Sequence, residues 1–399
     1  MFPPEIRYSC GICEFHDYCH KCWKSYEDKL DELHRHYLYK DQIFPEVIAT
    51  SINEAKDLTD CLLRCMKVYN IRFLLGTRKV VKRNNNVEEE FSKDFYWKTY
   101  SECLDLSMRF GNGLLSLPHI TERDKVGLCG VSSAEWLLSQ WGLFFKGFIS
   151  VPIHASFTPE QIAHILKLAE VTVLIISEHI LYKALEACHL LKERNTVRHI
   201  ITMKDNACSY VLRSLKDGDM DWPVPENVVT WSWNDIKEKG KYDEKIYRMK
   251  EDDIATLLST SGSTGMPKLT IMTNQMLTRG IYTGKAATEP MVMYAIEPLR
   301  QSLDLLCRGG RIGIYSGRHD KLLEDIQSLR PTVLGATPSF WNNLYSTFQE
   351  EASEYLKNNP GKDNLDFLQE FKAKKIFGNR LFIGMSFLHD LSVTCNFLN

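Results

Sequence analysis

The sequence predicts an α/β protein in which strands alternate with crossover helices. Two observations favour this class. Short apolar runs alternate with longer stretches in which apolar residues recur every three or four positions, which is the spacing of one helix face. In addition, 44% of the 399 residues are hydrophobic, which is ample for a large core and for more than one folding unit.

The alternation of strands and helices is clearest from residue 95 onward. Residues 95–100 predict a strand of alternating character, and residues 101–117 predict an amphipathic helix. The same criteria predict further strands at 125–129, 148–152, 171–176 and 199–203, and helices at 133–145, 159–169 and 180–191. Two more strands, 254–258 and 269–272, enclose a short polar loop. This order of elements predicts a sheet whose strands are connected by helices.

The part of the chain before residue 95 has a different pattern. Residues 41–80 predict helical structure, because the following apolar residues lie at helical spacing: Ile52, Ala55, Leu58, Leu62 and Met66. Residues 79–93 are charged and rich in asparagine, and they predict a surface loop. This region therefore reads as a helical extension followed by a linker.

Composition excludes several classes of protein. The formal net charge is −2, so the basic footprint of nucleic-acid binding is missing and we expect no nucleic-acid partner. No apolar stretch reaches the roughly 18 residues of a membrane-spanning helix, and no secretory signal is evident. We expect a cytoplasmic protein. In that compartment, the eight cysteines outside residues 10–22 are best interpreted as small buried apolar residues.

A polar loop between two apolar strands is the most informative stretch. Its candidate ligand-binding residues are Thr260, Ser261, Gly262, Ser263, Thr264, Gly265 and Lys268. Glycines let the backbone approach a ligand closely, and successive N–H groups can turn toward an anion. The hydroxyls add donors and the lysine adds a positive charge, so the combination favours a polyphosphate. A flexible Gly/Ser linker is the alternative, but the apolar strands on both sides argue against it.

This loop differs from a Walker A loop, in which the lysine directly follows the second glycine, because Met266 and Pro267 intervene. It resembles instead the phosphate loop of the acyl-adenylate-forming (AMP-binding) enzymes, [ST]-S-G-[ST]-T-G-x-P-K, at every position. Other segments resemble the long-chain fatty acid–CoA ligases of that superfamily: 97–100, 126–129, 135–136, 146–147, 151–154, 158–162, 309–312 and 329–333. The resemblance runs from about residue 50 to the end.

The resemblance implies a fold of stacked sheets with flanking helices. It implies that ATP, with Mg²⁺, activates a fatty acid as an acyl-adenylate, and that coenzyme A then accepts the acyl group. A carrier-protein thiol is the alternative acceptor. The residues of the loop would hold the β- and γ-phosphates, whereas no catalytic residue is assigned. A fatty-acid substrate would also be compatible with peripheral association with an intracellular membrane.

The sequence departs from the family pattern at several places. The motif Tyr-Gly-x-Thr-Glu has no match, nor do the later ribose-binding aspartate and catalytic lysine. Where relatives have Pro-Leu-x-His, this chain has Pro298-Leu299-Arg300-Gln301, and where they have Thr-His it has Thr273-Asn274. We therefore expect a C-terminally incomplete AMP-binding domain with little or no complete ligase activity.

Two closely spaced pairs of cysteines lie near the start of the chain. Each pair has the spacing with which two thiolates bind one Zn²⁺, and two histidines follow. The candidate ligands are Cys10, Cys13, Cys19, Cys22, His34 and His36. A single site of four cysteines and a reduced, metal-free segment both remain as alternatives.

The segment around these cysteines resembles part of a ZZ-type zinc finger, with Asp17 at the family's aspartate. The resemblance implies one site made of Cys10, Cys13, His34 and His36, a second site left half-formed, and a peptide or protein partner. An alternative function follows, namely a catalytically inactive zinc-finger interaction protein with a degenerate adenylation domain. We divide the chain into a zinc-binding segment 1–40, a helical extension and linker 41–94, and an AMP-binding domain 95–399.

Overall fold

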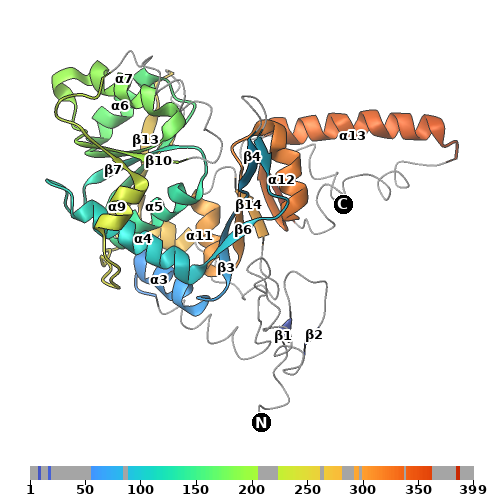
Figure 1. The fold of residues 1–399 in the computed structure, drawn as a ribbon, viewed down its shortest axis with the longest axis horizontal. Coiled ribbons are helices and arrows are strands. Elements are labelled where there is room, and N and C mark those ends of the chain that lie inside the picture. Colours follow the sequence, from blue (N-terminus) through green and yellow to red (C-terminus); the bar gives the residue numbers. More distant parts are fainter. Residues whose placement is uncertain are drawn as a thin grey trace, which may run out of the picture.

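Two mixed β-sheets and the helices around them form the body of the protein (Figure 1). The computed structural model describes residues 55–83, 89–204, 223–260, 265–280, 292–295, 299–336 and 338–361, and three short strands at 8–9, 17–18 and 383–386. Within these residues, one large sheet has seven strands and the other has six.

The seven-stranded sheet has the order β11-β10-β9-β7-β8-β12-β13. Its strands are β7 (Lys125–Gly130), β8 (Ile149–His154), β9 (Val173–Ser177), β10 (His199–Met203), β11 (Val229–Ser232), β12 (Ile254–Thr260) and β13 (Lys268–Thr273). Neighbouring strands are parallel except β13, which pairs antiparallel with β12. The connecting helices are α5 (Ala134–Phe145), α6 (Pro159–Ala169), α7 (Leu181–Leu191) and α9 (Trp233–Lys239). The alternating order predicted from the sequence is confirmed.

The six-stranded sheet has the order β17-β16-β14-β15-β3-β6. Its strands are β3 (Phe73–Thr77), β6 (Tyr96–Thr99), β14 (Val292–Ala295), β15 (Arg311–Ile314), β16 (Val333–Ala336) and β17 (Ile383–Ser386). Only β6 runs antiparallel to its neighbour. The helices of this part are α3 (Leu58–Val68), α4 (Tyr100–Leu115), α10 (Asn274–Gly280), α11 (Leu299–Cys307), α12 (Leu322–Leu329) and α13 (Pro338–Asn358). Short 3₁₀ turns lie at Glu178–Ile180, Lys192–Arg194 and His319–Lys321.

One hydrophobic core joins the two sheets. Buried residues of the first sheet, such as Val126, share this core with Leu75 and Ile312 of the second. Helices α4 and α5 lie between the sheets (Figure 1) and approach each other closely at two glycines. A Cβ on Gly111 would lie 2.7 Å from the Gly142 carbonyl oxygen, so a side chain here would force the helices apart. The sheets are therefore fixed to each other through the α4–α5 pair.

The predicted helix over 41–80 and the predicted loop over 79–93 are wrong in part. Only α3 is helical among the described residues of the first range, and residues 73–77 form β3 instead. Phe73, Leu74 and Leu75 are all buried, as expected for a strand with covered faces, and β3 pairs with β15 and β6. Residues Val80–Arg83 (β4) and Glu89–Phe91 (β5) form an antiparallel ladder rather than a loop.

Candidate functional site

The carboxyl ends of the parallel strands of the first sheet share one edge, and two helices begin there. Ser133 caps α5 by accepting a hydrogen bond from the Trp136 N–H at 3.1 Å. Thr158 caps α6 in a capping box with Gln161. Helix N-termini carry free N–H groups and a partial positive charge, so this edge favours an anionic ligand.

The hairpin of β12 and β13 presents the phosphate-loop sequence at this edge. Thr260 and Lys268 lie opposite each other in the ladder, at the base of the loop. Gly265 has φ +79°, with no atom within 4 Å of a Cβ built on it, so glycine is required by backbone conformation and not by space. Residues 261–264, namely Ser261, Gly262, Ser263 and Thr264, lie outside the described residues, and their role stays a prediction.

Gln161 ties the base of this loop to helix α6. Its Nε2 donates a hydrogen bond to the Gly265 carbonyl oxygen at 3.1 Å. Its Oε1 accepts a hydrogen bond from the Thr158 N–H at 3.1 Å and so completes the cap of α6. The Thr-Pro-x-Gln pattern predicts the cap, but the contact with Gly265 depends on tertiary structure and was not predicted.

Strand β12, which carries the loop, is held firmly against β8. The Thr256 hydroxyl donates to the Ser150 carbonyl oxygen at 3.0 Å, and the Ser259 hydroxyl donates to the Pro152 carbonyl oxygen at 3.2 Å. Leu257 of β12 and Leu269 of β13 pack against the smaller buried core of the first sheet. The base of the loop is therefore part of a rigid sheet rather than a free connection.

The connection between β8 and α6 lies at the same edge and is also fixed. Lys183 of α7 donates from Nζ to the carbonyl oxygens of Ala155 and Phe157, at 3.0 and 3.1 Å. The His154 Nδ1 lies 2.7 Å from the Ser156 hydroxyl. Because β8 and β12 are neighbouring strands, this connection places exposed polar groups such as His154 and Ser156 beside the base of the loop.

A cavity of about 310 Å³ opens where the two sheets face each other. It is lined by Thr77, Lys98, Leu106, Val131, Ser132, Ser133, Ala134, Glu135, Leu138, Lys204, Trp233, Asn234, Lys237, Ile314, Tyr315, Ser316 and Gly317. The charged members are three lysines and one glutamate, so the lining carries net positive charge. Together with the start of α5, this lining favours an anionic group. Sequence reasoning did not predict this cavity.

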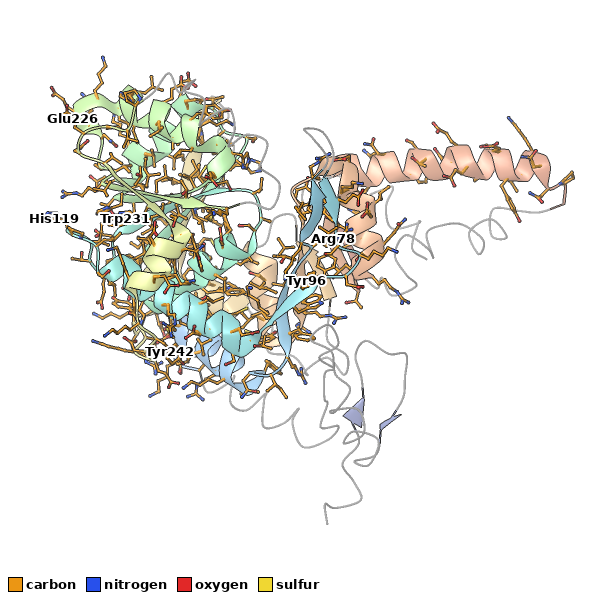
Figure 2. All side chains as sticks on the ribbon, viewed as in Figure 1. Arg78, Tyr96, His119, Glu226, Trp231 and Tyr242 are labelled. Carbon is orange, nitrogen blue, oxygen red and sulfur yellow. The ribbon has the colours of Figure 1, made fainter. Side chains whose placement is uncertain are left out.

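The buried Arg78, which directly follows β3 and is labelled in Figure 2, supports one wall of the cavity through Asp325. Arg78 donates from Nη1 to Asp325 Oδ1 at 2.8 Å and from Nε to the Ser92 carbonyl oxygen at 2.6 Å. Asp325 in turn accepts a hydrogen bond from the Ser316 N–H at 3.0 Å. Arg78 also pairs with Glu324, and its hydrogen bond holds the pKa of that carboxyl below its usual range.

Asn274, which replaces the histidine of the family pattern, has a structural role. Its Oδ1 accepts a hydrogen bond from the Leu58 N–H at 2.9 Å, and its Nδ2 donates to the Lys250 carbonyl oxygen at 3.1 Å. The side chain is 3% exposed. Asn274 thereby fixes the start of α3 to the strand that follows the phosphate loop, and it is committed to protein groups.

The predicted metal ligands Cys10, Cys13, Cys19, Cys22, His34 and His36 lie outside the described residues. The described strands β1 (Tyr8–Ser9) and β2 (Asp17–Tyr18) pair antiparallel, with Ser9 opposite Asp17. This ladder places the residues that precede Cys10 and Cys19 in neighbouring strands. The zinc site itself stays a prediction. The predicted burial of the scattered cysteines is confirmed for those described: Cys61, Cys65, Cys103, Cys129, Cys188 and Cys307.

The fold is similar to that of solved adenylate-forming proteins. The structure is similar to the adenylation domain of a carboxylate reductase from Mycobacterium chelonae, with a TM-score of 0.75 and 19% identity, covering 94% of this chain and 60% of that one. It is also similar to a long-chain-fatty-acid–CoA ligase from Archaeoglobus fulgidus, with a TM-score of 0.54 and 17% identity, covering 74% and 54%. The chain thus has the adenylation-domain fold, as its sequence predicted.

The chain belongs to the AMP-binding enzyme family, because the model of that family matches residues 77–381, more than half of the chain. It is 25% identical over 303 residues to long chain acyl-CoA synthetase 4 of Arabidopsis thaliana, covering 70% of this chain and 42% of that protein. It is 26% identical over 263 residues to fatty acyl-CoA synthetase A of Dictyostelium discoideum, covering 63% and 37%.

The chain therefore spans less than half the length of these two relatives. None of the helices in the described part of the chain is long and apolar enough to cross a membrane.

Proposed function

We propose that this chain binds ATP through the loop at 260–268 and contributes that binding to the activation of a fatty acid as an acyl-adenylate, with coenzyme A as the later acceptor. The observation that carries the proposal is the β12–β13 pair, in which Thr260 and Lys268, the two ends of the phosphate-loop pattern, lie opposite each other at the edge where α5 and α6 begin. The names of the relatives supply the acyl class and the coenzyme A acceptor.

In this reaction the protein contributes mainly by positioning the reactants and by neutralising the negative charge of the phosphates. The fatty-acid carboxylate attacks the α-phosphorus of ATP, the bond to the bridging oxygen breaks, and pyrophosphate leaves. Lys268 and the hydroxyls of the loop would hold the two outer phosphates in line for departure. ATP enters as its Mg²⁺ complex, the metal supplying further positive charge beside those phosphates. The thiol of coenzyme A then displaces AMP from the acyl carbon.

We expect this chain by itself to bind ATP but to complete little or no synthesis of acyl-CoA. The sequence has no match to the Tyr-Gly-x-Thr-Glu motif, which in the family supplies a threonine near the adenylate phosphate and a glutamate for Mg²⁺. The phosphate-binding loop is thus present without those two groups. Robust synthesis of acyl-CoA by this chain alone would contradict the expectation.

The test measures ATP binding by calorimetry and ATP–pyrophosphate exchange with fatty acids of increasing length. Lys268→Ala should weaken ATP binding by about tenfold or more, since one charge-assisted contact is lost. Lys167→Ala, an exposed lysine of α6, is the matched control and should leave binding unchanged. Equal affinity of the wild-type chain and the Lys268→Ala variant would contradict the proposal. Supplying carrier proteins in place of coenzyme A tests the acceptor.

A second candidate function is a zinc-containing interaction protein whose adenylation domain is inactive. The β1–β2 ladder favours it, because Ser9 and Tyr18, which precede Cys10 and Cys19 in the sequence, lie in paired strands. Zinc bound to a chain that fails to bind ATP would support this alternative. We also propose that segment 1–40 folds as a separate unit, whereas β3 belongs to the six-stranded sheet.

A further inference from the structure

Three cysteines that are far apart in the sequence meet in the core. Cys61 and Cys65 belong to α3, and Cys307 is the last residue of α11. The Sγ atoms of Cys61 and Cys307 lie 3.7 Å apart, and the three sulfur atoms all lie within 4.8 Å of one another. Among the described residues, this is the one group of three or more histidine, cysteine, aspartate or glutamate side chains close enough to share a metal ion.

The cluster is buried and its backbone is fixed. Cys61, Cys65 and Cys307 are 3%, 0% and 6% exposed. Cys61 and Cys65 are one helical turn apart, so both thiols project from the same face of α3. The phenol of Tyr69 donates to the Cys307 carbonyl oxygen at 3.4 Å, and the phenol of Tyr100 donates to the Gly310 carbonyl oxygen at 2.6 Å, so the end of α11 and the turn after it are held in place. The sulfur atoms are thus positioned before any ligand arrives.

The spacing of the sulfur atoms matches metal coordination better than a disulfide. Two thiolates that each lie about 2.3 Å from one metal ion in tetrahedral or trigonal geometry are roughly 3.8–4.0 Å apart. A disulfide requires an S–S distance of about 2.05 Å, and it would leave the third thiol unused. The separation of 3.7 Å between Cys61 and Cys307 lies next to the metal value, and it also allows a thiol–thiol hydrogen bond when no metal is bound.

We propose that Cys61, Cys65 and Cys307 form a site for one soft, thiolate-binding metal ion, either Zn²⁺ or Cu⁺, which joins α3 to α11. Thiolate sulfur selects these ions over Mg²⁺ and Ca²⁺. A metal ion also removes the thiol protons and compensates charge that would otherwise be unfavourable in the core.

The site would brace one wall of the cavity between the sheets. Helix α11 leads directly into β15, and α3 precedes β3, which pairs with β15. The ends of β3 and β15 contribute Thr77 and Ile314 to the cavity lining. A metal ion at the trio would therefore link the two helices that position these strands. The proposal is independent of ATP binding and does not rest on it.

The test uses the full chain in a background where the N-terminal cysteines, Cys10, Cys13, Cys19 and Cys22, are replaced by serine. Zn²⁺ and Cu⁺ are titrated in separate arms, with metal content measured by mass spectrometry and Cd²⁺ used to report thiolate ligation by ultraviolet absorption. We expect one metal per chain in at least one arm and a higher melting temperature. Cys65→Ser and Cys307→Ser should each weaken binding by about tenfold or more.

Cys103→Ser and Cys129→Ser are the controls, because both cysteines are buried but stand outside the trio. They should leave metal affinity unchanged. If a trio variant fails to fold, alkylation of the folded background chain under native conditions replaces it, and bound metal should slow modification of the three trio thiols more than that of Cys103 and Cys129. Metal uptake that survives Cys65→Ser and Cys307→Ser, absence of uptake in both arms, or protection spread equally to Cys103 and Cys129 would each overturn the proposal.

Discussion

Arg78 and Asp325 form an ion pair that is closed off from solvent. Their Nη1 and Oδ1 atoms are 2.8 Å apart, and the two side chains are 1% and 0% exposed. The second carboxylate oxygen of Asp325 accepts the Ser316 N–H, so the pair supports the chain that lines the cavity. Because both charged groups lose their hydration on folding, the intact pair contributes little net stability. Removing one member, however, leaves an unpaired buried charge, which is strongly destabilising.

Replacing Arg78 should therefore destabilise the protein strongly. Arg78→Met leaves a buried carboxylate without its cation and should lower the free energy of unfolding by about 3–5 kcal/mol. Arg109→Met is the control, because its pair with Asp105 is solvent-exposed at 2.9 Å and should contribute less than about 1 kcal/mol. Urea denaturation of both variants provides the comparison. An equal decrease in the free energy of unfolding in the two variants would show that burial of the ion pair does not determine the size of the effect.

His199 should make stability depend on pH in the mildly acidic range. Trp231 donates its indole N–H to Nδ1 at 3.2 Å, so Nε2 carries the proton and donates to the Pro118 carbonyl oxygen at 3.2 Å. Burial lowers the pKa of His199, and the charges of Arg198 and His119 act in the same direction. Protonation therefore favours the unfolded chain, in which the pKa is about 6.5.

The sign of this effect follows from linkage. Stability is fully present above the unfolded pKa and is lost as pH falls from about 6.5 toward the lower pKa of the folded state. His199→Gln can keep one donor and one acceptor but does not titrate. Unfolding free energies measured between pH 7.5 and pH 5, chosen to span that range, should fall more steeply for the wild type than for the variant. Parallel curves would exclude His199 as the cause.

Removing the Asn274 amide should destabilise the junction between α3 and β13. Asn274→Ala leaves the Leu58 N–H without its buried acceptor and should cost about 1–3 kcal/mol. Asn274→Asp keeps the acceptor but loses the donor to Lys250, so its effect should be distinguishable in a thermal melt. Asn234→Ala, an exposed amide, should change stability by less than about 0.5 kcal/mol. A neutral Asn274→Ala would contradict the role assigned here.

Gln161 offers a way to separate fold from ligand binding. Gln161→Glu keeps the oxygen that accepts the Thr158 N–H but removes the donor to the Gly265 carbonyl oxygen. If the loop binds ATP as proposed, affinity should fall about threefold to tenfold, while the melting temperature changes little. Gln161→Ala should lower both. Unchanged ATP affinity in Gln161→Glu would mean that this contact does not shape the loop.

Zinc content should reveal which ligand set the N-terminal segment uses. In a four-cysteine site, Cys19→Ser lowers bound zinc by one ion per chain and His34→Ala leaves it unchanged. In the ZZ-like arrangement, His34→Ala removes the metal instead. Both variants are compared with the unsubstituted chain by elemental analysis after dialysis. Zinc content that is the same in all three would contradict both arrangements.

Local sequence predicts the elements of the first sheet well, because their signals are short-range. Helix α6 has the predicted bounds 159–169, set by its Thr158 cap and by Pro159 at its first turn. Residues 73–77 were predicted as helix because they fall within 41–80, where the helical spacing of residues 52–66 set the prediction, and Phe73-Leu74-Leu75 by itself fits either structure. The strand partners of these residues include β15, which is more than 200 residues away. The error therefore reflects long-range pairing that periodicity cannot report.

The candidate site shows the same division. The phosphate loop is continuous in sequence, so its pattern was recognised directly. The contact of Gln161 with Gly265 joins residues 104 positions apart, and the cavity depends on how two sheets meet. The cysteine trio was interpreted as scattered core residues for the same reason. Each of these features depends on how the elements are arranged in space, which local sequence patterns do not report.

The second sheet combines strands from distant parts of the sequence, and this affects how the chain folds. Strands β3 and β6 come from residues 73–99, whereas the strands beside them come from residues 292–386. The whole first sheet is therefore synthesised before β3 meets β15, and until then β3 has β6 as a strand partner on one side only. A recombinant fragment that starts at residue 95 would lack β3 and leave β15 and β6 without their shared neighbour. Expression boundaries should accordingly begin before α3.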